Sequence, residues 1–287
     1  MKHSLIAIAL GAAFFSGTAL ADIPCDEAVI KYRQLNADIL GKSLPQGHPR
    51  SVETTISNRS ENGESTMSDE VNYDACGRLT SGRERINSVT FSSSGSTIKV
   101  EGSAHMRAHP NGWKYDIAMT TSVEEAGKQQ IGQINSQGFY ALNEQGWISV
   151  YKNTITTGLS GQSKSTIATS HYRINDKNQL VFSQTDKGLD RGEVRYTYNS
   201  NGQPEFIVSQ KKQISTVYDA NGRNLAFFSI TLYPWALISA SGRCQEWDKQ
   251  DNCTLVKHSE IEIGKKGQGT SRNLETRTVY RYWDDAK

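Results

Sequence analysis

Hydrophobic and polar side chains alternate along most of the chain, from about Val52 onward. A period of two is typical of strands that have one buried face and one solvated face. Asn-Gly, Ser-Gly and Asp-x-x-Gly groups separate the alternating runs at short intervals, a pattern that favours an antiparallel all-β protein. Clear runs are "STIKVEG" (96–102), "WKYDIAM" (113–119), "GEVRYTY" (192–198) and "TRTVYRYW" (276–283).

Residues 26–40, "DEAVIKYRQLNADIL", have a helical period instead. Acidic residues occupy the first turn, where they oppose the helix dipole, and Gly41 and Pro45 follow the last turn. A helix of this length needs a sheet on which to bury its apolar stripe. The stripe consists of Val29, Tyr32, Leu35 and Ile39.

A five-residue turn motif recurs at six places: an aromatic or aliphatic residue, Asp or Asn, two variable residues, then Gly, Asn or Asp. The Asp or Asn side chain can accept backbone N–H groups two residues on, and the last residue supplies the positive φ that reverses the chain. The motif is therefore interpreted as hairpin chemistry rather than as a site. The six copies are 73–77, 142–146, 174–178, 198–202, 218–222 and 247–251.

These patterns predict an all-β fold: an antiparallel β-meander of such hairpins, open or rolled around one short N-terminal α-helix. A transmembrane β-barrel is the alternative architecture, because alternating strands suit it. The four cysteines, the charges on both alternations and the charged end at 284–287 argue against that alternative.

The N-terminus has the three parts of a secretory signal peptide. A positive start is followed by a short apolar run (5–15) and by a small-x-small site that ends at Ala21. We expect residues 1–21 to be a signal peptide cleaved after Ala21, residues 22–46 to form a helical segment, and residues 47–287 to form the β-meander domain. The predicted location is periplasmic or secreted; a retained anchor is the alternative. No later segment approaches the ~20 apolar residues of a membrane helix, so no such span is expected.

Charge argues against a nucleic-acid partner. Removing residues 1–21 from the 287-residue chain leaves 266 residues, and the loss of Lys2 leaves 31 of the 32 basic side chains against 30 acidic ones. Proteins that bind nucleic acid or acidic membranes favour a strong basic excess.

The four cysteines, all beyond the predicted signal peptide, predict two disulfides in an oxidising compartment. Three connectivities are possible. Cys244 and Cys253 flank a predicted turn, which favours their local pairing and leaves Cys25 with Cys76. A zinc site is the alternative, but no Cys-x-x-Cys spacing supports it.

The stretch "VYDANGRNL" (217–225), with Tyr-Asp-x-x-Gly-Arg before an apolar strand, resembles the YD repeats of Rhs-type bacterial surface and toxin-shell proteins. The end of the chain, "EWDKQDNCTLVKHSEIEI" and "ETRTVYRYW", is similar to the last unit of small exported YD-repeat proteins. The resemblance covers about 174–283, with an outlying match at Tyr73. Asp251 stands where Gly is expected, and Cys253 stands in place of an aromatic residue. The resemblance implies a β-meander, implies almost nothing about activity, and suggests a toxin-associated accessory or immunity role.

Candidate catalytic and metal-ligating residues are sparse. His105 and His109 are four apart but lie in an alternating segment without an identifiable third ligand. The Ser/Gly-rich segments 91–98 and 157–163 do not fit a nucleophile elbow. The carboxylates of Asp186, Asp190 and Glu193 are interleaved with cations, as in a solvated turn. We therefore predict no catalytic residue, no metal and no cofactor.

The most apolar later stretch is "FFSITLYPWALISASG" (227–242). Two core strands joined by a turn at Pro234 explain it; the alternative is an exposed aromatic loop that binds a partner's groove or a sugar ring. Under that alternative, the candidate binding residues are Tyr233, Trp235, Trp147 and Trp113.

The leading functional hypothesis is an exported, non-catalytic binding protein for an unidentified protein or glycan, with an accessory or immunity-type factor as one form. The alternatives are an envelope scaffold without a discrete ligand and a glycan or cell-wall hydrolase. A hydrolase lacks a visible catalytic constellation, so enzymatic activity is not expected.

Overall fold

The computed structural model describes residues 25–42, 44–60, 63–91, 96–125, 127–159, 161–188, 191–233, 236–264, 267 and 269–284. The predicted signal peptide (1–21) lies outside these residues. One helix, α1 (Glu27–Ile39), precedes sixteen strands. The strands are β1 (Pro49–Ser60), β2 (Gly63–Tyr73), β3 (Leu79–Phe91), β4 (Thr97–His109), β5 (Gly112–Glu125), β6 (Lys128–Leu142), β7 (Ile148–Leu159), β8 (Gln162–Ile174), β9 (Leu180–Thr185), β10 (Gly192–Tyr198), β11 (Pro204–Ser209), β12 (Lys212–Tyr218), β13 (Asn224–Leu232), β14 (Ala236–Trp247), β15 (Cys253–Gly264) and β16 (Gly269–Tyr282).

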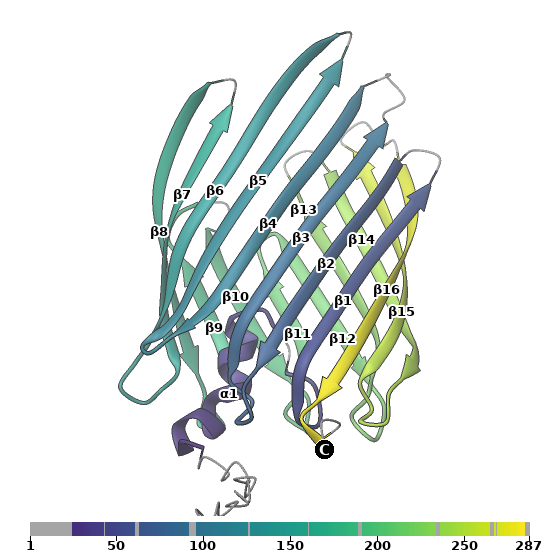
Figure 1. Cartoon of the computed structure of the whole chain (residues 1–287). Helices are drawn as coiled ribbons and strands as arrows, with labels where there is room; N and C mark the ends of the chain where they lie inside the picture. The colour runs from purple at the N-terminus through teal and green to yellow at the C-terminus, as the bar shows by residue number, and fades with distance from the viewer. Residues whose placement is uncertain are drawn as a thin grey trace, which may run out of the picture.

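Each strand pairs antiparallel with the next one along the chain, and β1 pairs with β16, which closes the sheet into a barrel (Figure 1). Val52 opposite Tyr280 and Thr54 opposite Thr278 fix the register of this closing pair. Closure removes the exposed edges that an open sheet would have. The predicted antiparallel all-β meander with one short N-terminal helix is confirmed, in its rolled form.

All six predicted turn motifs form hairpin turns, and all six lie at the same end of the barrel, here called the turn end. In the turn at Asp219, one carboxylate oxygen accepts the N–H groups of Asn221 and Arg223, both at 2.9 Å, and Gly222 has φ +82°. Asn178 and Asp251 occupy the Gly position of their turns with φ 58° and 62°. The same double acceptance recurs at Asp74, Asn143, Asn175, Asn199 and Asp248.

Neighbouring turns are linked by the residue that follows the positive-φ position. Gln179 Nε2 donates to the Gly202 carbonyl at 3.2 Å, and Gln203 Nε2 donates to the Gly222 carbonyl at 2.6 Å. The motif tyrosines add a second link, because Tyr198 Oη donates to the carbonyl of Leu180 at 2.8 Å. The turn end is therefore a hydrogen-bonded rim.

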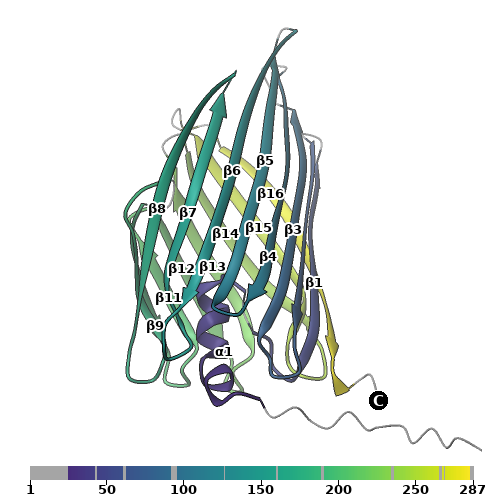
Figure 2. The ribbon, with the colours of Figure 1, turned by 60° about the vertical axis from the view of Figure 1, so that its left-hand side comes forward.

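Helix α1 lies inside the turn end of the barrel (Figure 2). Its Asp26 cap accepts the Ala28 N–H at 2.8 Å, so the helix begins where the sequence predicts. Asn36 fixes the helix to the wall: its Nδ2 donates to the Gly146 carbonyl at 3.1 Å, and its Oδ1 accepts the Ile148 N–H at 2.8 Å. The core lies between the helix and the β2–β9 wall, and its most buried members are Tyr32, Leu35, Ile39, Leu40, Val71, Tyr73, Leu79, Met106, Trp113, Ile148 and Leu180.

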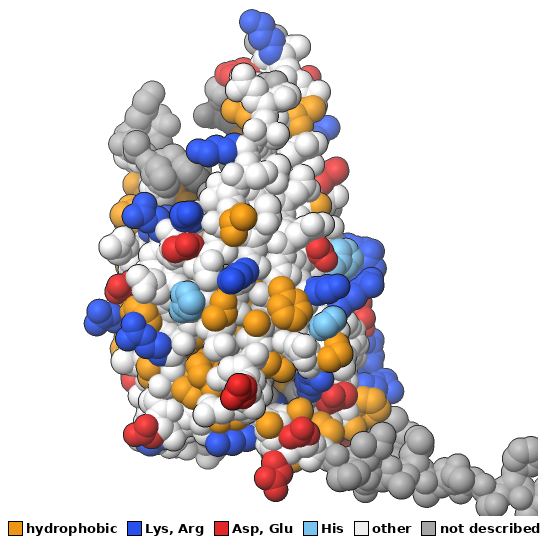
Figure 3. Space-filling model, turned by 90° about the vertical axis from the view of Figure 1, so that its left-hand side faces the viewer, with side chains coloured by type: hydrophobic (Ala, Val, Ile, Leu, Met, Phe, Trp, Pro, Cys, Tyr) orange, Lys and Arg blue, Asp and Glu red, His pale blue; other side chains and the backbone are white. Residues whose placement is uncertain are grey.

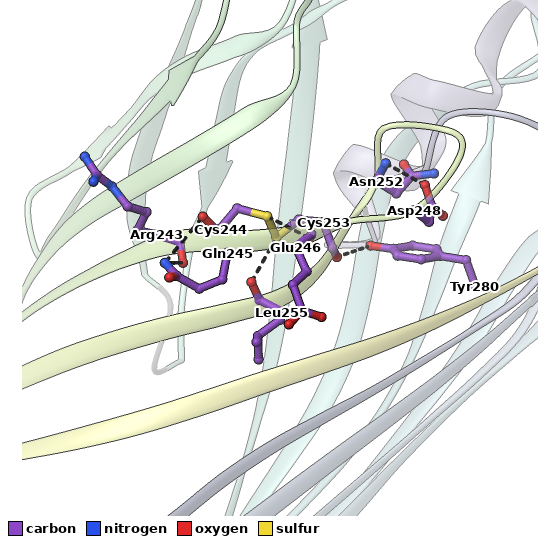
Figure 4. The surroundings of a disulfide bond; sticks show 9 residues. All are labelled: Arg243, Cys244, Gln245, Glu246, Asp248, Asn252, Cys253, Leu255 and Tyr280. Carbon is purple, nitrogen blue, oxygen red and sulfur yellow. Dashed lines mark hydrogen bonds between the residues drawn. A yellow bond between two sulfur atoms is a disulfide. The ribbon is translucent and has the colours of Figure 1, made fainter.

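Both predicted disulfides are present. Cys25–Cys76 ties the residue before α1 to the β2–β3 turn, with Cα atoms 5.6 Å apart. Cys244–Cys253 joins β14 to β15 across their turn (Figure 4). The first bond anchors the N-terminal end of the helix to the rim.

The outward positions differ around the barrel. On β4 and β5 they carry exposed charged side chains, among them Glu101, Arg107, Lys114 and Asp116. Figure 3 shows the side of the barrel that is on the left in Figure 1, where Lys, Arg, Asp and Glu side chains are scattered and hydrophobic side chains lie between them, most of them toward the turn end.

On β13–β15, by contrast, outward positions are often apolar. Phe228, Ile230 and Leu232 are 53, 48 and 54% exposed. The apolar stretch 227–242 thus forms two wall strands joined near Pro234, and the expectation that both are core strands is wrong for their outward half.

Candidate functional site

The candidate site is a chamber of about 550 Å³ inside the turn end, between α1 and a wall formed by β11–β13, β15, β16, β1 and β2 with the turns beside them. It arises because α1 packs its apolar stripe on the β2–β9 side, so the rest of the barrel cross-section stays unfilled. Its volume is within the range of small-molecule sites. The lumen chamber, as it is called below, is lined mainly by Gln34, Asp38, Lys42, Leu44, Gln46, Val52, Thr54, Asp69, Val71, Tyr73, Gln203, Tyr218, Asn252, Thr278 and Tyr280.

Lys42, just after the helix, is the one cation among the described lining residues. Its Nζ lies 2.9 Å from Asp69 Oδ1 and also contacts the Glu84 carboxylate, and the lysine side chain is 8% exposed. Burial raises the pKa of Asp69, and the Lys42 charge opposes that rise. Both carboxylates are held by one ammonium group, so this cluster fastens the C-terminal end of the helix to β2 and β3.

Asp38 lies in the last turn of α1 and lines the chamber. Its Oδ1 accepts a hydrogen bond from Gln34 Nε2 at 2.8 Å. Burial raises the pKa of Asp38 to about 6, and the Gln34 hydrogen bond opposes this only in part. Within the described part of the chain, no ion pair includes Asp38. Its charge at neutral pH is therefore held in the barrel without a cation.

Two tyrosines contribute aromatic surface to the chamber, Tyr218 and Tyr280; Tyr73 also borders it, but this residue is 4% exposed and belongs to the core. Tyr218 Oη donates to the Pro204 carbonyl at 2.9 Å, and Tyr280 Oη donates to the Cys253 carbonyl at 3.0 Å. Burial raises the pKa of Tyr280 to about 12, so the phenol stays protonated. The hydroxyl groups of Tyr218 and Tyr280 are therefore bonded to the barrel wall, and their rings remain available to contact a ligand.

Beyond the chamber, the upper lumen has an apolar wall and a polar wall. β3–β6 turn Ile86, Val100, Ile117 and Met119 inward, by their register with buried Ala104 and Met106. The β15–β16 side carries His258, Glu260 and Arg272, with Arg272 Nε 2.7 Å from Glu260 Oε1. Burial lowers the pKa of His258, whose ring contacts the Thr276 hydroxyl. The charged pair and the histidine already have partners, so the lumen chamber is the stronger candidate.

The predicted aromatic binding residues are dispersed. Trp113 is 2% exposed and donates from Nε1 to the Leu79 carbonyl at 2.8 Å, which places its ring in the core. Trp147 is half-buried beside the core and donates to Gln145. Tyr233, at the β13–β14 connection, is 40% exposed, and Trp235 lies outside the described residues. Trp113 and Trp147 both belong to the core at the turn end, whereas Tyr233 lies at the other end of the barrel, so the three described rings do not form one surface.

The other sequence candidates have local roles. His109 packs edge-on against Phe139, with ring centroids 5.6 Å apart. Asp186 accepts the Thr169 N–H at 2.7 Å, and Glu193 lies 3.8 Å from Arg195 on an exposed strand. Asp190 lies outside the described residues. Among the residues that the structure describes, no group of three or more His, Cys, Asp or Glu side chains could hold a metal ion.

Sequence reasoning missed Asp38 and Lys42. Asp38 directly precedes the apolar Ile39, and it looks like an ordinary solvated helix position until the barrel closes around it. The signal in the sequence that could have indicated this cluster is Lys42, because it directly follows a helix that has to pack on a sheet.

Comparisons with known proteins add the following. No helix in the described part of the chain is both long and apolar enough to cross a membrane. No family model and no curated protein matches the sequence. Among solved structures, the chain is similar to a porin-like protein from Bacteroides uniformis, with a TM-score of 0.47 and 13% sequence identity over 83% of this chain and 99% of that one. A likeness at this level carries no argument about function.

Proposed function

We propose that this protein is an exported, non-catalytic binding protein that holds a small ligand in the lumen chamber. The observation that carries the proposal is the chamber itself: a space of about 550 Å³ that combines aromatic surface with a half-buried carboxylate. Concave sites with mostly apolar walls and a few convergent polar groups are the usual form of ligand pockets.

The outer surface of β4 and β5 supports an aqueous, periplasmic or secreted setting. Barrels that cross a membrane turn apolar residues outward in a continuous band and polar residues inward. Here the outward positions of β4 and β5 include Glu101, Arg107, Lys114 and Asp116, whereas inward positions of the same strands include Val100, Ile117 and Met119. This arrangement favours water around the β4–β5 side of the barrel, whereas Phe228, Ile230 and Leu232 give β13 an apolar outer face. The two disulfides suit an oxidising compartment.

Binding is favoured over glycan hydrolysis because of how the chamber's carboxylates are used. Glycoside hydrolysis generally needs two carboxyl groups that face the substrate from opposite sides. Asp69 and Glu84 are both committed to Lys42, and Asp38 stands apart from them on the helix. An accessory or immunity-type interaction with a protein stays a prediction from the YD-repeat resemblance.

Two tryptophan variants of β16 test the proposal. Thr278 lines the chamber, and the next residue, Val279, points outward and is 51% exposed. Thr278→Trp therefore places an indole in the chamber, and Val279→Trp places the same ring on the outside.

The purified mature protein and both variants would be dialysed against a low-molecular-mass extract of the periplasm, and retained compounds identified by mass spectrometry. We expect the wild type and Val279→Trp to retain the same compound and Thr278→Trp to lose it. Equal retention by all three proteins, or no retained compound, would refute the proposal.

A further inference from the structure

The chamber is rich in negative charge and poor in free cations. Lys42 is shared by Asp69 and Glu84, which leaves this cluster with one more carboxylate than ammonium group. Asp38 adds a second uncompensated carboxylate. Asp251, at the chamber's edge, has only a 3.7 Å approach to Arg223, which is already paired with Asp219 at 2.7 Å. A ligand that brings a positive charge would therefore be stabilised here.

The fold itself does not require a charge at Asp38. The hydrogen bond from Gln34 could be accepted equally by the amide oxygen of an asparagine, which would have no charge to desolvate. A residue that destabilises the folded state and makes no compensating structural interaction is expected mainly at a functional site. Asp38 is such a residue, and its carboxylate lines the chamber.

Several of the chamber's hydrogen-bond donors are already used by the wall. Gln203 Nε2 donates to the Gly222 carbonyl, and Asn252 Nδ2 donates to the Gln46 carbonyl and to Tyr282 Oη. The hydroxyls of Thr54 and Thr278 lie 3.3 Å apart, so one of them donates to the other. A sugar would need donors as well as acceptors along its hydroxyl groups, and an anion would need donors. These bonds reduce the donors left for either kind of ligand, and the amide side chains of Gln46 and Asn224 are further donors that line the chamber.

The groups that remain available to a ligand in the chamber include aromatic rings and a carboxylate. Tyr218 and Tyr280 are fixed to the wall by their hydroxyls, so each offers a ring rather than a donor to the chamber. Aromatic rings and a carboxylate together are the chemistry that recognises substituted ammonium groups.

We propose that the lumen chamber binds a small organic ammonium cation, with Asp38 as its counter-ion and Tyr218 and Tyr280 as its aromatic lining. This inference rests on the proposed binding function and adds the chemical class of the ligand.

Calorimetric titration of the mature protein at pH 7.5 tests the role of charge. The probes are choline, putrescine and spermidine, with 3,3-dimethyl-1-butanol as the uncharged isostere of choline and maltose as a neutral sugar. We expect at least one of the cations to bind, and the isostere to bind roughly tenfold more weakly than choline or not at all. Equal binding of choline and its isostere, or no binding by any of the three cations, would overturn the inference.

Two pairs of variants locate the site. Asp38→Asn should weaken cation binding about tenfold or more, whereas Asp116→Asn, on the outer face of β5, should leave it unchanged. Tyr218→Phe keeps the ring and should retain binding, whereas Tyr218→Leu should weaken it severalfold. Thermal unfolding of each variant confirms that it is folded. Undiminished cation binding by Asp38→Asn would contradict the assignment.

The two proposals can fail separately. Retention of a neutral compound that Thr278→Trp abolishes, with no affinity for the cations, would leave a ligand in the chamber and remove the ammonium assignment. Retention that Thr278→Trp does not affect would remove both.

Discussion

Replacing Asp38 by Asn should stabilise the protein at neutral pH. The pKa of this carboxyl is raised from 3.8 to about 6 because burial disfavours its charged form. A pKa difference of one between the folded and unfolded states corresponds to about 1.4 kcal/mol, so an ionised Asp38 lowers the free energy of unfolding by about 3 kcal/mol at pH 7.5. The asparagine keeps the hydrogen bond from Gln34 and has no charge to bury, so it should recover most of that amount.

The sign of the pH dependence follows from the raised pKa. Between about pH 4 and pH 6 the folded protein holds a proton on Asp38 that the unfolded chain releases, so stability falls as the pH rises through this window. Above pH 6 the full cost is present, and below about pH 4 it is absent. The advantage of Asp38→Asn should therefore be greatest at pH 7.5 and should vanish near pH 3.5.

Urea unfolding with both disulfides intact measures this difference, followed by circular dichroism at pH 7.5 and at pH 3.5. Asp116→Asn is the control, because Asp116 is exposed on the outside of β5 and should change stability little at either pH. Equal stabilities of wild type and Asp38→Asn at pH 7.5 would refute the reasoning. An Asp38→Asn protein less stable than the wild type would show that the carboxylate has a cation partner.

Four further predictions concern the site and its supports. Cation binding, measured by calorimetry, should weaken from pH 7.5 to pH 5 as Asp38 gains a proton, and binding that does not change with pH would exclude Asp38 as the counter-ion. The titratable groups that face Asp38 are Tyr196 and Tyr198 on β10, Tyr218 on β12, and Lys42 and Asp69 across the chamber. Lys42→Met leaves Asp69 and Glu84 buried without their ammonium partner and should lower the free energy of unfolding by about 3 kcal/mol, a loss that urea titration would detect. Asn199→Ala removes the acceptor for the N–H groups of Asn201 and Gln203 and should lower stability by about 1–2 kcal/mol, whereas Asn201→Ala in the same turn should have little effect. Replacing Cys25 and Cys76 together by Ser should reduce stability by about 2–4 kcal/mol and make residues near α1 the first sites of limited proteolysis; unchanged cleavage would show that the disulfide does not hold the helix.

The turns were predictable from sequence because their chemistry is local. In Tyr218-Asp219-Ala220-Asn221-Gly222, one side chain accepts two nearby N–H groups and one glycine takes a positive φ, and nothing distant is needed. The helix and the Cys244–Cys253 pairing are local in the same sense. Even Asp251, which departs from the glycine of the motif, takes the expected left-handed conformation.

Closure of the barrel was not decided by the sequence. It depends on the pairing of β1 with β16, whose residues are more than two hundred positions apart, for example Val52 opposite Tyr280. No local pattern in either strand specifies that partner. The lumen chamber was unpredictable for the same reason, because it exists only once the sheet encloses α1 off centre.

Long-range placement also explains why the aromatic candidates were misplaced. Exposed and buried rings look alike in sequence: Trp113 has the neighbours of a surface aromatic near a turn, yet it is 2% exposed beneath α1. Asp38 shows the converse, since a charged helix residue is expected to be solvated and is instead enclosed. In both cases the helix position inside the barrel, rather than the residue's neighbours in the chain, determines its role.

The most direct test of the central claim is a crystal structure of the protein grown with (2-bromoethyl)trimethylammonium, in which the anomalous signal of bromine locates the cation. We predict a single strong peak in the lumen chamber, beside Asp38, and no such peak for Asp38→Asn. A peak elsewhere on the barrel, or a chamber that stays empty at concentrations that saturate binding in solution, would contradict the account.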